Sequence, residues 1–270
     1  MAVIPICWTT PVSADKPAYE VPALARAHAL LSRLSERGAP MRAAELARDS
    51  GMPRSSLYLL LETLEARRWI ERAGDGYVIG LTLLSLGSAY LRHDNLEPAF
   101  RDAAADFVAR HNEVMQLAML DGADVAYLAR EDARRPVRLV TDPGSRLPAH
   151  ACALGKALLA SLSDAEVLAR LPSPLPAITD RTITDPARLL AELATARRTG
   201  FALDLEEVSA GLTCYAAYVG RTPLGRRVAV STSLPADRLD PRHADAVRAG
   251  LIAAARQIAL RATAEEPPAP

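Results

Sequence analysis

A run of leucines early in the chain predicts an amphipathic helix that opens at Pro53. Leu57, Leu60, Leu61 and Leu64 recur at i, i+3, i+4 and i+7, which places them on one stripe of a helix. Proline suits the first turn, because the N–H that it lacks has no helical partner there. The polar side of this helix carries Arg54, Ser55, Ser56, Tyr58 and Glu62. Such a helix suits the reading of DNA, but the spacing alone equally fits an ordinary surface helix.

The segments around this helix favour the first alternative. Two helices are predicted before it, at 21–37 and 42–49, and a Gly-containing turn at 50–52 joins the second to it. Strands at 69–72 and 77–79, joined by a tight turn at 74–76, form a hairpin after it. The buried face of the first helix is expected to consist of Leu24, Ala27, Leu31 and Leu34. Three helices and a hairpin predict a winged helix-turn-helix; a packing module without a nucleic-acid partner is the alternative.

The rest of the chain predicts a second domain. An apolar helix at 80–92 is too hydrophobic to lie alone in water, so it should pack on the second domain or on another subunit. From Val114 the hydrophobic period approaches two, as in a strand. Strands are expected at 114–120, 125–130, 137–141, 201–204, 213–219 and 227–233, and helices at 96–111, 151–162, 164–170, 186–199 and 241–262. This order indicates an α+β fold with a mainly antiparallel sheet.

These patterns divide the chain into five parts. They are a flexible arm at 1–19, a winged helix-turn-helix domain at 20–80, a linker helix at 81–95, a second domain at 96–263 and a disordered tail at 264–270.

The composition limits the class of protein. Half of the 270 residues are apolar and 24% are charged, as in globular domains. No apolar run approaches the roughly 18 residues of a membrane span, and the N-terminus lacks the pattern of a secretory signal. Cys7, Cys152 and Cys214 are too few for a disulfide framework, so we expect a cytoplasmic protein. Since the net charge is zero, attraction to DNA must depend on where the arginines point.

Four stretches carry a family likeness. They are 44–47 with 51–56, then 76–80, then 148–160, and finally 200–207 with Gly211 and Cys214. In these stretches, and across about residues 21–262, the chain resembles the IclR family of bacterial transcriptional regulators. The resemblance implies a winged-helix domain, a linker helix and a GAF-like effector-binding domain in a homodimer or tetramer. It also implies a repressor or activator of a catabolic operon that binds a palindromic operator in double-stranded DNA.

Seven residues are candidates for DNA contacts. Arg54 can bind guanine or phosphate, Ser55 and Ser56 suit phosphate oxygens at a helix N-terminus, and Tyr58 can pack on a thymine methyl group. Arg72 in the hairpin is a candidate for the backbone. Arg42 and Arg26 flank the site, although solvent exposure alone explains them equally well.

The resemblance also implies an effector cavity for a small organic acid, expected to be a carboxylate. Carried over by position, its residues are Ala153, Gly155, Asp204, Cys214, Ser231 and Ser233. Free N–H groups at the start of the helix near Gly155 would attract the carboxylate, and alternate serines face one side of a strand. For Cys214 the alternative is a small buried hydrophobic residue.

Departures from the family pattern leave other hypotheses open. Leu59 stands where the family commonly has Arg, and Glu62 adds an acid to the same helix, which suggests a sensor or scaffold with weakened DNA binding. In the second domain, Cys152 and Tyr218 replace Thr and Pro and put the identity of the effector in doubt. A thiol-dependent enzyme is the least favoured hypothesis, because no orienting group accompanies a Cys–His pair. We expect no enzymatic activity, no cofactor and no metal.

Overall fold

A computed structural model describes residues 20–91, 95–134, 139, 141–238 and 240–263. The chain divides into two units, the first ending at residue 93 and the second beginning at residue 94. The predicted arm at 1–19 and the predicted tail at 264–270 lie outside the described residues.

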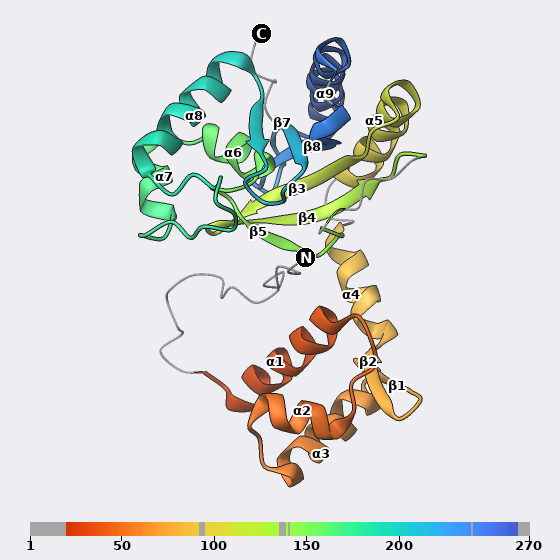
Figure 1. The fold of residues 1–270 in the computed structure, drawn as a ribbon. Coiled ribbons are helices and arrows are strands. Elements are labelled where there is room, and N and C mark those ends of the chain that lie inside the picture. The colour runs from red at the N-terminus through yellow and green to blue at the C-terminus, as the bar shows by residue number, and fades with distance from the viewer. Residues whose placement is uncertain (1–19, 92–94, 135–138, 140, 239, 264–270) are drawn as a thin grey trace. The chain divides into compact units, whose positions relative to one another are not determined.

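The first unit is a winged helix-turn-helix (Figure 1). Its elements are α1 (Pro22–Arg37), α2 (Ala43–Ser50), α3 (Arg54–Ala66), β1 (Ile70–Ala73), β2 (Gly76–Ile79) and α4 (Leu81–Leu91). Gly51 ends α2 with a φ of 63°, a left-handed conformation that glycine adopts without strain, and so allows the tight turn into α3. α3 begins at Arg54, so Pro53 is its N-cap residue and does not lie within the first turn as predicted. The strands β1 and β2 pair in antiparallel fashion as the wing.

The predicted buried face of α1 needs a correction. Leu24 is 64% exposed, whereas Ala27, Leu30 and Leu34 are buried and Leu31 is half-buried. Leu24 lies in the first turn, before the helix meets the rest of the small core. The sequence pattern allows either Leu30 or Leu31 on the buried face of an amphipathic helix. Packing of α1 against α2 and β2 decides that Leu30 is the one that is fully buried.

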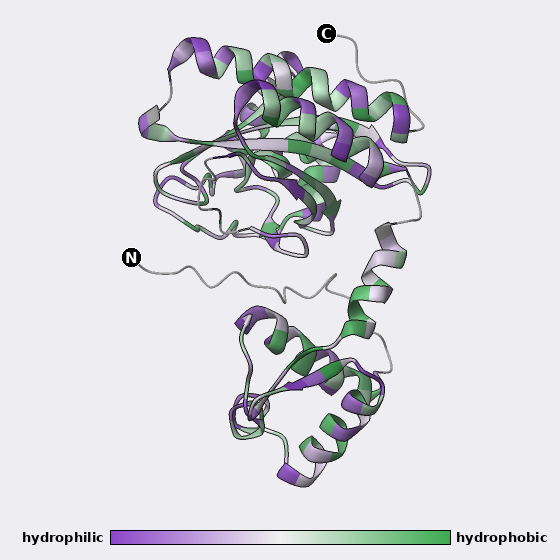
Figure 2. Ribbon diagram, turned by 90° about the vertical axis from the view of Figure 1, so that its right-hand side faces the viewer, coloured by the Kyte–Doolittle hydropathy of each residue, from purple (hydrophilic) through white to green (hydrophobic). Residues whose placement is uncertain are grey.

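The helix α4 leaves the wing as an apolar segment. The carboxylate of Glu71 accepts a hydrogen bond from the Leu81 N–H at 3.0 Å, which satisfies a free donor at the start of the helix. Figure 2 shows α4 in green and white, the colours of apolar and neutral residues. Leu81, Leu84 and Leu86 are more than half exposed and Tyr90 is 38% exposed. Such a surface is typical of a helix that packs against another protein surface.

The second unit is an α+β domain built on a six-stranded antiparallel sheet. Its strands are β3 (Met115–Asp121), β4 (Asp124–Glu131), β5 (Arg146–Pro148), β6 (Ala202–Leu205), β7 (Leu212–Arg221) and β8 (Arg227–Pro235), in the order β5-β4-β3-β8-β7-β6. Its helices are α5 (Leu96–His111), α6 (Ala153–Ala160), α7 (Asp164–Arg170), α8 (Pro186–Thr199) and α9 (Pro241–Ala262), with a 3-10 turn at Ala236–Arg238.

Helices cover the two faces of this sheet and form two hydrophobic cores. α6, α7 and α8 lie on one face, and α5 and α9 pack together on the other (Figure 1). The long strands β7 and β8 are buried along most of their length because both faces are covered.

The strand predicted at 137–141 is wrong where it can be examined. Leu139 and Thr141 are not in a strand, and the remaining residues of the prediction lie outside the described residues. The edge strand is β5 instead, which pairs with β4 from Asp124 to Ala126. Three residues including a proline give no periodic signal, so only the pairing with β4 identifies this strand.

Candidate functional site

The outer surface of α3 presents the residues expected to contact DNA. Leu57, Leu61 and Leu64 are buried in the core of the first unit, so the opposite side of the helix faces outward. Arg54, Ser55, Tyr58, Leu59 and Glu62 are exposed there, and Ser56 is half-buried. Tyr58 is 52% and Leu59 is 67% exposed, so their apolar atoms face outward. The helix therefore combines a cation, hydroxyl groups and an apolar patch on one surface.

The three other candidate arginines are placed differently from Arg54. The guanidinium of Arg72 binds the Glu65 carboxylate at 3.0 Å and lies 5.1 Å from the centre of the Tyr77 ring. The side chain thus links the wing to α3. Arg42 lies 3.7 Å from carboxylate oxygens of both Glu45 and Asp75, at an exposed position. Arg26 is exposed on α1.

Two rows of polar residues cross the sheet beneath α6. Asp204, Cys214 and Ser233 are direct partners on β6, β7 and β8, and Ser231 is the partner of Gln116 on β3. Ser231 and Ser233 are two residues apart and so face the same side of the strand. The Cys214 Sγ lies 3.1 Å from the Ser233 Oγ. Residues distant in sequence are therefore brought together by strand register.

The N-terminus of α6 lies over these polar residues of the sheet. Cys152 is the N-cap residue, and its Sγ accepts a hydrogen bond from the Gly155 N–H at 3.3 Å. Ala153 and Leu154 follow it and line the same cavity as the polar rows. Gly155 is not among the lining residues: a Cβ at this position would lie 2.0 Å from the carbonyl oxygen of Ala149. The glycine is required because α6 passes so close to that backbone.

The cavity is small and mixed in character. It has a volume of about 40 Å³, room for about three water molecules. Five of the six predicted effector residues line it, namely Ala153, Asp204, Cys214, Ser231 and Ser233. The other polar or thiol groups in its wall are Gln116, Tyr127, Thr141, Cys152 and Ser209.

Sequence reasoning missed most of these additional wall residues. The Gln116 amide donates to Thr141 Oγ1 at 2.8 Å, and both side chains are buried. A glutamine inside an apolar strand was the available signal, because a buried amide requires partners. The pairing with Thr141 depends on a loop that sequence periodicity does not describe.

Asp204 is the acidic group of the cavity wall. It is 3% exposed, and its Oδ1 accepts a hydrogen bond from the Glu207 N–H at 2.7 Å. Burial raises the pKa of this carboxyl to about 7, although the hydrogen bond favours the charged form. Near neutral pH the group can therefore exist either as an acceptor or as a hydrogen-bond donor.

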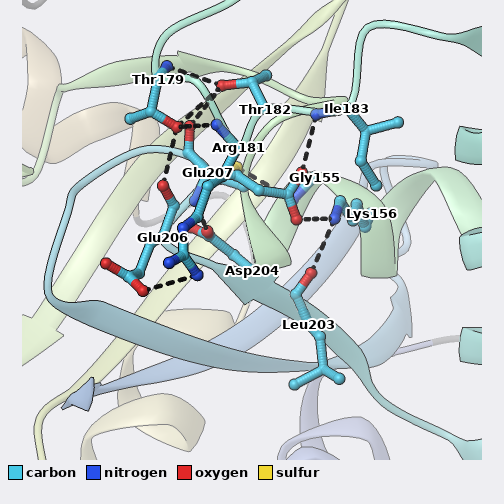
Figure 3. A network of polar contacts seen from close by, with 11 residues as sticks. Gly155, Lys156, Thr179, Arg181, Thr182, Ile183, Leu203, Asp204, Glu206 and Glu207 are labelled. Carbon is cyan, nitrogen blue, oxygen red and sulfur yellow. Dashed lines mark hydrogen bonds and ion pairs between the residues drawn. The ribbon is translucent and has the colours of Figure 1, made fainter. Parts of the chain in front are cut away.

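A buried ion pair supports the loop that carries Asp204 (Figure 3). The Lys156 ammonium on α6 binds the Glu207 carboxylate and also donates to the Leu203 carbonyl at 3.0 Å. The other Glu207 carboxylate oxygen accepts from the Ile183 N–H at 3.3 Å. Thr182 Oγ1 donates to the Glu207 carbonyl at 2.7 Å. Lys156 is 1% exposed, so this network fixes α6, β6 and the loop after β6 to one another.

The two described cysteines are poor nucleophiles in this environment. Both are free thiols, and burial raises the pKa of Cys152 to about 12 and that of Cys214 well above its usual value. His150 Nε2 contacts the Pro176 carbonyl at 2.9 Å, and no hydrogen bond joins its imidazole to either thiol among the described residues. The geometry gives the thiol-dependent enzyme hypothesis no support.

Among the residues that the structure describes, no three His, Cys, Asp or Glu side chains are grouped as they would be around a metal ion. None of the helices among these residues has the length and apolar character needed to cross a bilayer.

Comparison with known families decides the classification. Residues 23–74 match the IclR helix-turn-helix domain, and residues 88–260 match the bacterial transcriptional regulator IclR C-terminal domain. The chain belongs to the IclR family.

Relatives of known name extend along nearly the whole chain. The transcriptional repressor IclR of Escherichia coli K12 is 29% identical over 256 residues, 93% of each protein. The HTH-type transcriptional regulator BhcR of Paracoccus denitrificans is 31% identical, over 80% of this chain and 78% of its own.

Solved structures of family members have the same fold. Thermotoga maritima IclR superposes with a TM-score of 0.73 at 26% identity, covering 88% of this chain and 98% of its own. An IclR homologue from Microbacterium hydrocarbonoxydans, crystallised with 4-hydroxybenzoate, superposes with a TM-score of 0.76 at 27% identity, covering 88% and 98%. This IclR-family chain is thus a transcriptional regulator with an N-terminal DNA-binding domain and a C-terminal effector-binding domain.

Proposed function

We propose that the protein is a repressor whose affinity for a palindromic operator changes when a small organic acid enters the cavity beneath α6. The observation that carries this proposal is the convergence of Ala153, Asp204, Cys214, Ser231 and Ser233 on one cavity. Three strands and one helix contribute these residues, and such a set of polar groups around a concave space is typical of a ligand site.

The chemistry of the wall defines the ligand. The free N–H groups at the start of α6 and the hydroxyl groups of Ser231 and Ser233 can donate to a carboxylate. No arginine or lysine is among the described residues that line the cavity, and its 40 Å³ suit a compact acid of a few heavy atoms. Asp204 can bind a hydroxyl group of the ligand or, when protonated, donate to its carboxylate. A ligand as large as 4-hydroxybenzoate would require the cavity to expand.

Arg54, Ser55, Ser56 and Tyr58 are the proposed operator contacts. The exposure of Arg54, Ser55 and Tyr58 along one side of α3 supports direct contact with the major groove, and the half-buried Ser56 adjoins them at the start of the helix. Leu59, 67% exposed on the same side, would contact a thymine methyl group instead of donating a hydrogen bond. Because Arg72 binds Glu65, the wing arginine would reach a phosphate only by giving up that ion pair.

Self-association is proposed to occur through α4. Two copies of this helix would bury Leu81 and Leu84, which lie three residues apart on one face and which a single copy leaves exposed. Leu84→Glu should therefore convert the oligomer to a smaller species in analytical ultracentrifugation and weaken operator binding with it. Thr82→Glu is not a suitable control, since its hydroxyl donates to the Arg67 carbonyl, whereas Leu86→Glu makes the same leucine-to-glutamate change at an exposed position on the opposite side of the helix.

Footprinting tests the proposed function as a whole. The purified full chain should protect a palindrome beside its own gene, and one of a panel of two- to four-carbon acids should change that protection. Ser233→Ala should retain the footprint and lose the response to the acid. A protein that protects no palindrome, while it still binds the acid, would instead be the sensor with weakened DNA binding that Glu62 and Leu59 suggest.

A further inference from the structure

A second and much larger opening lies at the other end of α6. It has a volume of about 490 Å³, against about 40 Å³ for the cavity beneath the helix N-terminus. Ala157 and Ala160 from the C-terminal half of α6 form one wall together with the C-cap residue Ser161. The end of α8, the start of β6 and the β7–β8 hairpin form the rest. This volume falls within the range of about 300–1,000 Å³ that is usual for small-molecule sites.

Two arginines face each other across the hairpin at the edge of this cleft. Arg221 at the end of β7 and Arg227 at the start of β8 are direct partners in the strand register, and both line the cleft. Like charges directly opposite on antiparallel strands destabilise a sheet. An anion bound between the two guanidinium groups would remove that repulsion.

The hydrogen bonding of this pair is incomplete. Arg221 Nε is buried and has no hydrogen-bond partner among the described residues. Arg227 Nε donates to Ser161 Oγ at 3.0 Å, which fixes that guanidinium at the wall of the cleft. A buried N–H without an acceptor costs free energy, so an oxyanion at this point would supply the missing hydrogen-bond acceptor.

A third arginine at this cleft has acceptors for its guanidinium group within the protein. Arg197 on α8 donates to the carbonyl oxygens of Ala160 and Leu162, each at 2.9 Å, and binds the Asp164 carboxylate at 2.9 Å. These bonds tie α8 to the end of α6. Arg197 therefore holds the wall in place, whereas Arg221 and Arg227 retain the capacity to bind an anion.

The floor of the cleft is apolar and has small side chains. Ala157, Ala160, Ala196 and Ala202 leave the space open. The ring of Phe201 packs against Tyr215 and Arg248 on the other side of the sheet and does not fill it. Such a floor suits a flat hydrocarbon body and gives nothing to a small inorganic ion.

We propose that this cleft is a second ligand site, which binds an aromatic carboxylate with its oxyanion between Arg221 and Arg227. It differs from the effector cavity in all three respects that decide ligand class: it carries two available cations, its floor is apolar, and its volume is more than tenfold larger. The site is independent of which acid binds beneath the N-terminus of α6.

Calorimetric titration of the full chain with benzoate tests the proposal. Arg221→Gln and Arg227→Gln should each weaken benzoate binding by about tenfold or more, because each removes a charge-assisted hydrogen bond. Arg198→Gln, an exposed neighbour on α8 outside the cleft, should leave it unchanged. If Asp204→Asn weakens benzoate and the two cleft variants do not, benzoate occupies the effector cavity and the proposal is wrong.

Two further measurements keep the test independent of folding. In the absence of ligand, Arg221→Gln should melt at the same temperature as the wild type or higher, because the like-charge contact is gone. Ala160→Leu, which keeps both arginines and fills the floor, should reduce binding of benzoate much more than binding of inorganic phosphate. Equal affinity of the wild type for phosphate and benzoate would overturn the ligand class. A change in oligomeric state in the arginine variants, with benzoate binding intact, would show that a second copy covers the cleft and would also overturn it.

Discussion

The two units of the chain hold their candidate functional residues in opposite ways. In the first, Arg54 and Tyr58 project from a helix whose other side is core, so function lies on the surface and stability beneath it. In the second, Asp204 and Ser233 are themselves buried, and the same residues help to hold the domain together. We therefore expect substitutions of the candidate residues in the first unit to weaken binding without loss of stability. In the second unit, substitutions of the candidate residues should change binding and stability together.

The largest effect is expected at the buried ion pair of the second unit. Lys156→Met should destabilise the protein by about 3–5 kcal/mol, because it leaves the Glu207 carboxylate buried without its cation. Urea unfolding followed by circular dichroism would measure this loss. Replacing both partners, as in Lys156→Met with Glu207→Leu, should recover most of the stability.

The matched control is an exposed ion pair. Arg101 and Glu97 lie 2.7 Å apart on α5, with the arginine side chain 71% exposed. Arg101→Met should change stability by less than about 1 kcal/mol. An equal loss in both variants would break the distinction between buried and exposed charges on which the comparison rests.

In the first unit, Arg54→Ala should abolish specific operator binding without loss of stability. Removal of a contact to guanine or phosphate costs about 1–3 kcal/mol per operator half-site, so a dimer should lose about 30-fold or more in affinity. Gel shifts at fixed salt would measure this loss, and unchanged thermal unfolding would show that the fold is intact. Arg110→Ala, an exposed arginine of α5, is the control. Unaltered gel shifts for Arg54→Ala would show that α3 does not read the operator.

The pH dependence of the second unit should differ between the wild type and Asp204→Asn. The pKa of Asp204 is raised from 3.8 to about 7 in the folded protein, so the folded state binds more protons than the unfolded state between these values. The contribution of Asp204 to stability is thus fully present below about pH 4 and is lost as pH rises toward 7. The wild type should lose stability relative to the variant over this interval.

Effector binding should follow the same group. Above about pH 7 the ionised Asp204 repels a carboxylate ligand, so affinity should fall by up to about tenfold per pH unit. Titrations of the acid at several pH values would show this slope in the wild type and a flat profile in Asp204→Asn. If affinity depends on pH in the same way in the two proteins, Asp204 does not take part in recognition of the carboxylate.

The smallest effect is expected at Glu62. Replacing this exposed acid of α3 by glutamine removes repulsion from DNA phosphates and should raise operator affinity by about two- to threefold, more at low salt than at high salt. Fluorescence anisotropy would resolve this change, with Glu97→Gln on α5 as the control. A decrease in affinity would mean that Glu62 accepts a hydrogen bond from a base.

The accuracy of the sequence predictions depended on local signals. The structure has α5, α7, α8 and α9 at the predicted residues, because caps such as Asp185 followed by Pro186 and Asp240 followed by Pro241 mark their starts. The strand expected at 137–141 and the burial of Leu24 failed where no local signal chose between alternatives. Edge pairing placed β5, and packing against α2 and β2 fixed which stripe of α1 is buried.

By itself the sequence determined the helices with clear caps, the alternation of the long strands and the leucine stripe of α3, because each depends on residues within a few positions of one another. Tertiary structure alone decided that Gly155 serves close packing while Cys152 lines the cavity, and that Lys156 lies in the core beside Glu207. It also set Arg221 opposite Arg227 above an open floor. These outcomes depend on strand register and helix approach, which bring together residues that share no pattern along the chain.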